Sequence, residues 1–171
     1  MRLFNAKRAQ VYTFVAILLL AFAFSVARPP TPSQPASDAF EELHKNFDTE
    51  SVIVINNALY RNVNLSEDFT AFADDYFDYA RTKAPKFRFL YLLKDGDTLI
   101  IGNKLDLSVN ASVLGAHYNV SSNSKLTIAP QNVTIDLEGL RYDFTFTSED
   151  YQIKSLFRQK NEQGRRVFVN D

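Results

Sequence analysis

Apolar and polar positions divide the chain into two parts with different periods. Between residues 38 and 84 apolar positions recur every three or four residues, which is the spacing of one helix face. From residue 87 onward they alternate with polar positions, and this places successive side chains on opposite faces of a strand. We therefore expect an α+β fold, in which two helices pack on an antiparallel sheet of about six strands with one polar face.

The first predicted helix runs from Asp38 to about Arg61. Asp38, with Glu41 three residues later, fits an N-cap with its reciprocal glutamate. The segment "SVIVI" at 51–55 leaves a strand open as the alternative, because β-branched residues favour strands. The apolar stripe of this helix comprises Phe40, Leu43, Phe47, Val54 and Ala58.

The second predicted helix starts at Ser66, which can cap it, and carries Glu67 and Asp68 in its first turn. It ends at Ala84, since the residue before a proline avoids helical geometry. The stripe that faces the core comprises Phe69, Phe72, Ala73, Tyr76 and Ala80.

The strands follow one another after Pro85. "KDGD" carries an Asp-Gly turn, a strong hairpin signal, between the first two strands. One face of the first strand takes Phe87, Phe89, Tyr91 and Leu93. The predicted strand segments are "FRFLYLL", "TLIIG", "LDLSVNASV", "NVTIDL", "RYDFTFT" and a final pair, "YQIKSLF" with "RRVFV", around a turn that contains Gly164.

A long apolar stretch precedes the helices. The 19 residues from Ala9 to Ala27 carry no formal charge, which is enough for one membrane span. The basic residues Arg2, Lys7 and Arg8 precede it, so we expect the N-terminus in the cytoplasm and the bulk of the chain outside. The expected organisation is a cytoplasmic basic leader at 1–10, a membrane or signal-anchor helix in contact with lipid at 11–27, a linker with four prolines at 28–37, and an extracytoplasmic α+β domain at 38–171.

Two processing sites compete in this stretch. Small residues at Ser25 and Ala27 fit an ordinary signal-peptide cleavage before Arg28, which would release a soluble domain. Alternatively, "KRAQ" followed by the apolar run resembles the class III signal peptides of archaeal type IV pilin-like proteins. That resemblance implies cleavage between Ala9 and Gln10, a prepilin-type peptidase as a partner, and other pilin-like subunits beside the retained helix.

The chain departs from the pilin pattern in two places. Phe14 stands at the fifth mature position, where many pilins carry glutamate, and the prolines of 28–37 interrupt the long helix that pilins use. Both departures favour a domain on a short stalk over a filament subunit.

Composition excludes several chemistries. The chain has no cysteine and a net charge of −1, so disulfides, thiolate sites and nucleic-acid binding are not expected. Asn103, Lys104 and Asp106 match the guanine-recognition motif of GTPases, but no phosphate-binding loop accompanies them. His44 is expected to be half-buried and His117 to lie on the sheet surface. We expect no catalytic residue, no cofactor and no metal site.

Two charged clusters are expected to be solvated surfaces. The acidic one, on the second helix, is paired locally with Arg81 and comprises Asp74, Asp75 and Asp78. The basic one, on the C-terminal hairpin, comprises Lys154, Arg158, Lys160, Arg165 and Arg166.

Four sequons for N-glycosylation are the most distinctive motif of the domain. In the strand alternation, those after residue 100 are expected to point to solvent. The alternative is that a polar strand face is simply rich in Asn, Ser and Thr. The candidate asparagines are Asn64, Asn110, Asn119 and Asn132.

These features predict a single-pass membrane protein with its domain outside the cell. The first functional hypothesis is a pilin-like or surface-structural protein without catalytic activity. The alternatives are an extracytoplasmic binding module, or a soluble domain secreted after cleavage at Ala27.

Overall fold

The computed structural model describes residues 36–161 and 164–170. The expected leader, membrane span and processing sites lie outside these residues, as does the linker up to Pro35. Within the described ranges, no helix is both long and apolar enough to cross a membrane.

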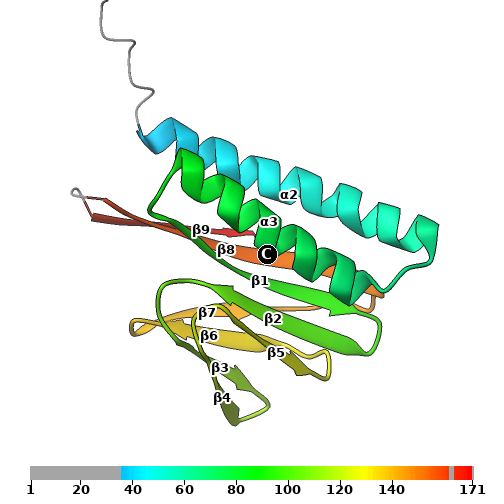
Figure 1. Ribbon diagram of the computed structural model, residues 1–171. Helices are drawn as coiled ribbons and strands as arrows, with labels where there is room; N and C mark the ends of the chain where they lie inside the picture. The colour runs from blue at the N-terminus through cyan, green and yellow to red at the C-terminus, as the bar shows by residue number, and fades with distance from the viewer. Residues whose placement is uncertain (1–35, 162–163, 171) are drawn as a thin grey trace, which may run out of the picture. The chain divides into compact units, whose positions relative to one another are not determined.

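The domain has three layers: two helices, a five-stranded sheet and a four-stranded sheet (Figure 1). The helices are α2 (Ala36–Arg61) and α3 (Leu65–Lys83). Sheet A has the strand order β5-β2-β1-β8-β9, with β1 (Phe87–Asp95), β2 (Thr98–Lys104), β5 (Ser124–Ile128), β8 (Tyr151–Asn161) and β9 (Gly164–Asn170). Sheet B has the order β4-β3-β6-β7, with β3 (Val109–Val113), β4 (Ala116–Val120), β6 (Val133–Leu137) and β7 (Leu140–Phe144).

Sheet A is buried on both faces, because the helices cover one and sheet B covers the other (Figure 1). Strand β1 shows the consequence most clearly. Its predicted apolar face lies in the core beneath the helices, and the intervening Leu90 and Leu92 are equally buried, in the core against sheet B. The α+β class is confirmed. The single sheet of about six strands with a polar face is wrong, since the described chain forms nine strands in two sheets.

The core between the helices and sheet A is built from aromatic rings around Phe47. This side chain is fully buried on α2, and five ring centroids lie 4.8–6.3 Å from its own. Edge-to-face and tilted pairs at such distances add to the gain from burial. Truncating a ring of this kind costs about 3–5 kcal/mol. The five partner rings are Phe69, Phe72 and Tyr76 of α3, Phe89 of β1 and Phe157 of β8.

The helix boundaries differ from the prediction at both N-termini. Helix α2 begins at Ala36 rather than Asp38, and "SVIVI" is helical, with Ile55 facing the core. Helix α3 is capped by Asn64, whose Oδ1 accepts a hydrogen bond from the Glu67 backbone N–H at 3.2 Å. The predicted cap, Ser66, lies inside the helix and donates its hydroxyl to Asp95 Oδ2 at 2.7 Å. The predicted end at Ala84 is confirmed.

Strands β4 and β5 were not predicted, because their burial does not follow an apolar alternation. In β4 only Val120 is buried, and β5 is an edge strand of sheet A with no fully buried residue. The β3–β4 turn depends on Leu114 and Gly115, which both have positive φ, 48° and 81°. Two successive residues of this kind form the type I′ turn that matches hairpin twist.

Gly102 is required where the helices meet sheet A. It is the cross-strand partner of Tyr91, and a Cβ at position 102 would lie 2.1 Å from the Tyr91 ring. The absence of a side chain at position 102 therefore leaves room for the Tyr91 ring. Burial raises the pKa of the Tyr91 phenol, which therefore stays neutral in the core.

We expect Gly102→Ala to destabilise the protein by about 1–3 kcal/mol, since the added methyl group displaces the ring. The measurement is the free energy of unfolding in urea, for the single variant and for the same change in a Tyr91→Leu background. With the ring absent, the cost of Gly102→Ala should largely vanish. An equal cost in both backgrounds would show that ring contact is not the cause.

Candidate functional site

The outer face of sheet B carries polar side chains on all four of its strands. Its two central strands, β3 and β6, alternate strictly, so that their inner side chains pack on sheet A and the outer ones face solvent. On β3, for example, Val109, Ala111 and Val113 are buried, whereas Asn110 is exposed and Ser112 is half-buried between them.

Strand register arranges the outer side chains in two rows that cross all four strands. The first row, in strand order from β4 to β7, is His117, Ser112, Thr134 and Asp143. The second row is Asn119, Asn110, Asp136 and Arg141. Sequence reasoning recognised single residues of these rows but not the rows, because they depend on the pairing of four strands.

Hydrogen bonds connect neighbours along both rows. In the first row, the Ser112 hydroxyl and His117 Nδ1 share a hydrogen bond of 2.7 Å, and Thr134 Oγ1 donates to Asp143 Oδ1 at 2.6 Å. In the second row, Asn119 Nδ2 donates to Asn110 Oδ1 at 3.2 Å. These bonds hold the side chains in fixed positions on the open face.

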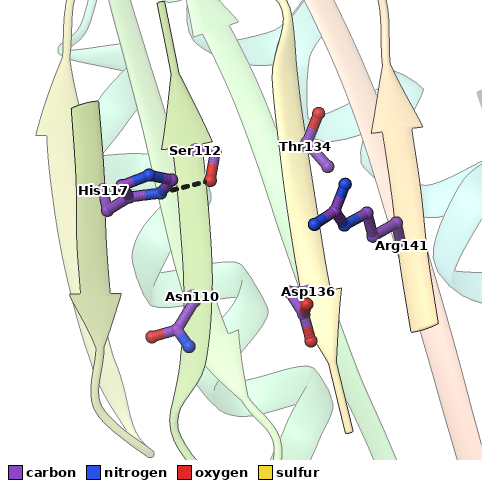
Figure 2. Close-up of a pocket in the computed structure, with 6 residues that line it drawn as sticks. All are labelled: Asn110, Ser112, His117, Thr134, Asp136 and Arg141. Atoms are coloured by element: carbon purple, nitrogen blue, oxygen red, sulfur yellow. Dashed lines mark hydrogen bonds between the residues drawn. The ribbon is translucent and has the colours of Figure 1, made fainter. Parts of the chain in front are cut away.

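A depression of about 460 Å³ lies between the rows (Figure 2). Every side chain that lines it is polar. Asp136 is held in place, since its Oδ1 accepts a hydrogen bond from the Gly139 backbone N–H at 3.0 Å. The lining residues are Asn110, Ser112, His117, Thr134, Asp136 and Arg141.

Arg141 is the only cationic side chain that lines this depression. Figure 2 shows its guanidinium reaching from β7 toward β6, between the levels of Thr134 and Asp136. No residue in the described part of the chain forms a hydrogen bond or ion pair with this side chain. Its N–H donors are therefore available to a bound molecule.

The Ser112–His117 pair brings together a hydroxyl and an imidazole that the sequence places five residues apart. His117 lies on the sheet surface, as predicted, but its hydrogen bond was missed. The signal was the two-residue turn at Leu114–Gly115, which makes residues 112 and 117 direct partners. No described carboxylate hydrogen-bonds to His117, and the nearest acidic position in the depression, Asp136, is two strands away.

Three of the four sequons lie on or beside this face. Asn110 and Asn119 are exposed, and Asn132 is exposed directly before β6, with its Oδ1 accepting from the Phe146 backbone N–H at 3.1 Å. In an extended strand, residues i and i+2 share a face, so each asparagine and its hydroxyl partner point the same way. Asn64 lies apart, as the cap of α3.

The residues of the GTPase-like motif form structural contacts at the junction between the two sheets. Asn103 is fully buried, and its Nδ2 donates to the carbonyls of Leu107, Val120 and Ser121 at 2.9–3.1 Å. Its Oδ1 accepts from the Leu105 backbone N–H at 2.9 Å. The amide therefore fixes the turn out of β2 and the end of β4.

The other two motif residues also have structural partners. Lys104 forms an ion pair with Asp74 of α3, so this member of the acidic cluster contacts sheet A and is not paired with Arg81 as expected. Arg81 instead lies over the Phe77 ring, 5.4 Å from its centroid. Asp106 accepts from Arg158 Nη1 at 2.6 Å.

The prediction that the basic cluster on the C-terminal hairpin is a solvated surface is wrong for Arg158. Its side chain is only 5% exposed, and Nη2 also donates to Glu138 Oε1 at 3.0 Å. The guanidinium joins β8 of sheet A to the β6–β7 turn of sheet B. Lys154 contacts the Phe146 ring, with Nζ 5.5 Å from the centroid.

His44 is half-buried, as predicted, and stacks on Phe168 with ring centroids 4.9 Å apart. Within the described residues, no group of three or more His, Asp or Glu side chains is placed to hold a metal ion.

No known protein family, characterised protein or solved structure matches this chain significantly.

We expect Asn103→Ala to lower the free energy of unfolding by about 3 kcal/mol, because it leaves buried backbone groups without partners. Urea unfolding measures the loss. Asn57→Ala, at an exposed position of α2, is the matched control and should change stability by no more than about 0.5 kcal/mol. A loss at Asn103 as small as that of the control would mean that the amide does not hold the junction.

Proposed function

We propose that the protein is anchored in the cell membrane by its N-terminal apolar stretch and displays the α+β domain outside the cell, as a pilin-like or surface-structural protein without catalytic activity. The observation that carries the proposal is the uncharged run from Ala9 to Ala27 behind a basic flank. The compact unit that follows it begins at Ala36. Among the described residues, the two hydrophobic cores of that unit extend from Phe40 to Phe168.

The polar face of sheet B supports an extracytoplasmic position. Three asparagines of the sequons are exposed there, where an attached glycan would extend into solvent without disturbing either core. Strand alternation itself favours the Asn-x-Ser/Thr spacing on a polar face, so the positions of the sequons carry more weight than their number.

A second candidate function is an extracytoplasmic binding module. The specific observation in its favour is the depression on sheet B with the unpartnered Arg141 guanidinium. A charged side chain that is not used for stability is free to recognise a ligand. Both candidates share the anchor and differ in whether the polar face binds anything.

The anchor is tested on protein purified from its native membranes. We expect it to remain in the membrane fraction after carbonate washing, because about 20 apolar residues insert stably in a bilayer. The N-terminal sequence should begin at Gln10 or upstream of it, and the intact mass should match a chain that starts there. A soluble protein in the medium that begins at Arg28 would refute the anchor and establish ordinary signal-peptide cleavage.

Glycan positions are tested by tryptic mapping of the same sample. Asn110 and Asn119 share the peptide Leu105–Lys125, whereas Asn132 lies in Leu126–Arg141 and Asn64 in Asn62–Arg81. We expect at most one glycan on Leu105–Lys125, at Asn119, because β4 is an edge strand and the two side chains are in contact. Two glycans on this peptide would contradict the expected crowding, and bare peptides throughout would contradict a glycosylated face.

A further inference from the structure

We propose that the depression on the outer face of sheet B binds a saccharide that bears a carboxylate, such as a uronic acid unit. The inference deepens the binding-module candidate and rests on it. It is carried by the polarity of the lining, the free guanidinium and the charge balance of the depression.

The lining selects a polar, hydroxyl-rich ligand. Small-molecule sites are usually lined by apolar side chains with a few polar groups, and their volumes are about 300–1,000 Å³. This depression, at about 460 Å³, has a comparable size, but all six lining side chains are polar. An apolar ligand would displace water from these groups without replacing the lost hydrogen bonds, which is unfavourable.

The Arg141 guanidinium favours a ligand that carries an anionic group. Its planar guanidinium can donate two parallel hydrogen bonds to a carboxylate. No described residue uses these donors, and Figure 2 shows them directed over β6 into the depression. The neighbouring Asp136 is its register partner on β6 but accepts from Gly139 instead.

The charge balance favours a single carboxylate over phosphate or sulfate. The lining of the depression holds one cation, Arg141, and one anion, Asp136, and the Asp143 carboxylate beside it is engaged by the Thr134 hydroxyl. A saccharide hydroxyl can donate to Asp136, whereas sulfate has no donor. Sulfate and doubly charged phosphate also carry a second negative charge, so Asp136 repels them more strongly than it repels a single carboxylate.

The remaining lining residues suit the hydroxyls of the same sugar ring. Asn110 keeps its Nδ2 donor free, because only its Oδ1 is engaged by Asn119. The Ser112–His117 pair offers both donor and acceptor atoms on the opposite wall. Such groups, held on paired strands, need little rearrangement to bind a ligand.

The test is an NMR titration of the full-length, isotopically labelled protein in detergent micelles with glucuronate oligomers. We expect shifts of backbone amides confined to residues around 110–112, 134–136 and 141. Glucose oligomers should bind at least about tenfold more weakly, since they lack the charge-assisted pair. Sodium sulfate and inorganic phosphate are titrated separately at equal ionic strength.

Arg141→Gln should weaken glucuronate binding at least about tenfold while leaving the urea unfolding midpoint unchanged. Lys125→Gln, which removes an exposed cation from β5, is the matched control and should bind as the unaltered protein does. The proposal is overturned by an absence of shifts at these residues, by equal binding of Arg141→Gln, or by sulfate or phosphate binding as tightly as glucuronate. Membrane fractionation and intact mass are independent of this titration, so a failure here leaves the anchor proposal intact.

Discussion

The burial of strand β1 on both faces is the constraint on which the rest of the structure depends. Phe87, Phe89 and Tyr91 require a layer of helices on one side, and Leu90 and Leu92 require a second apolar layer on the other. A two-layer arrangement of helices on one open sheet would expose the second set to water. Sheet B supplies the missing layer, and its own alternation then leaves one face polar and accessible.

Polar side chains buried between the layers form hydrogen bonds that connect the two sheets and fix how one packs on the other. Asn103 binds the chain where it leaves β2 for sheet B, and Arg158 joins β8 to Asp106 and Glu138. At the other end of β1, Lys94 donates to the carbonyls of Thr147 and Glu149 at 2.8 and 2.5 Å. A buried polar group that loses its partner is costly, so these contacts favour one packing of the sheets over sliding alternatives.

The sequence predicts what depends on neighbouring residues, and it misses what depends on distant ones. Helix α3 and strand β1 were recognised because their apolar positions repeat with a clear period, and Pro85 marks the boundary between them. The second sheet could not be inferred from "FRFLYLL", since a nearly continuous apolar run does not say what covers each face. The sequence predicted a solvated side chain for Arg158, because its partners, Asp106 and Glu138, lie far from it in the chain.

In the candidate site, too, features set by neighbouring residues could be predicted and features set by distant residues could not. The outward direction of Asn110 and Asn132 follows from alternation within one strand. The rows that make the depression require the order of four strands, and His117 meets Ser112 only because Leu114 and Gly115 form a tight turn. Arg141 carries no local signal at all, since a single arginine in a polar strand resembles any exposed cation.

The pairing of β1 with β8 has a consequence for how the chain is made. Phe87 pairs with Gln159, so the central strand of sheet A gains its second neighbour only when nearly the whole chain has been synthesised. Until then the β1–β2 hairpin presents an unpaired apolar edge, the kind of surface that pairs with other chains. Contacts so distant in sequence also form slowly, because a long loop must close first. During synthesis the helices and first hairpin emerge ahead of their partner strands, and this half of the domain must remain apart from its neighbours until β8 arrives.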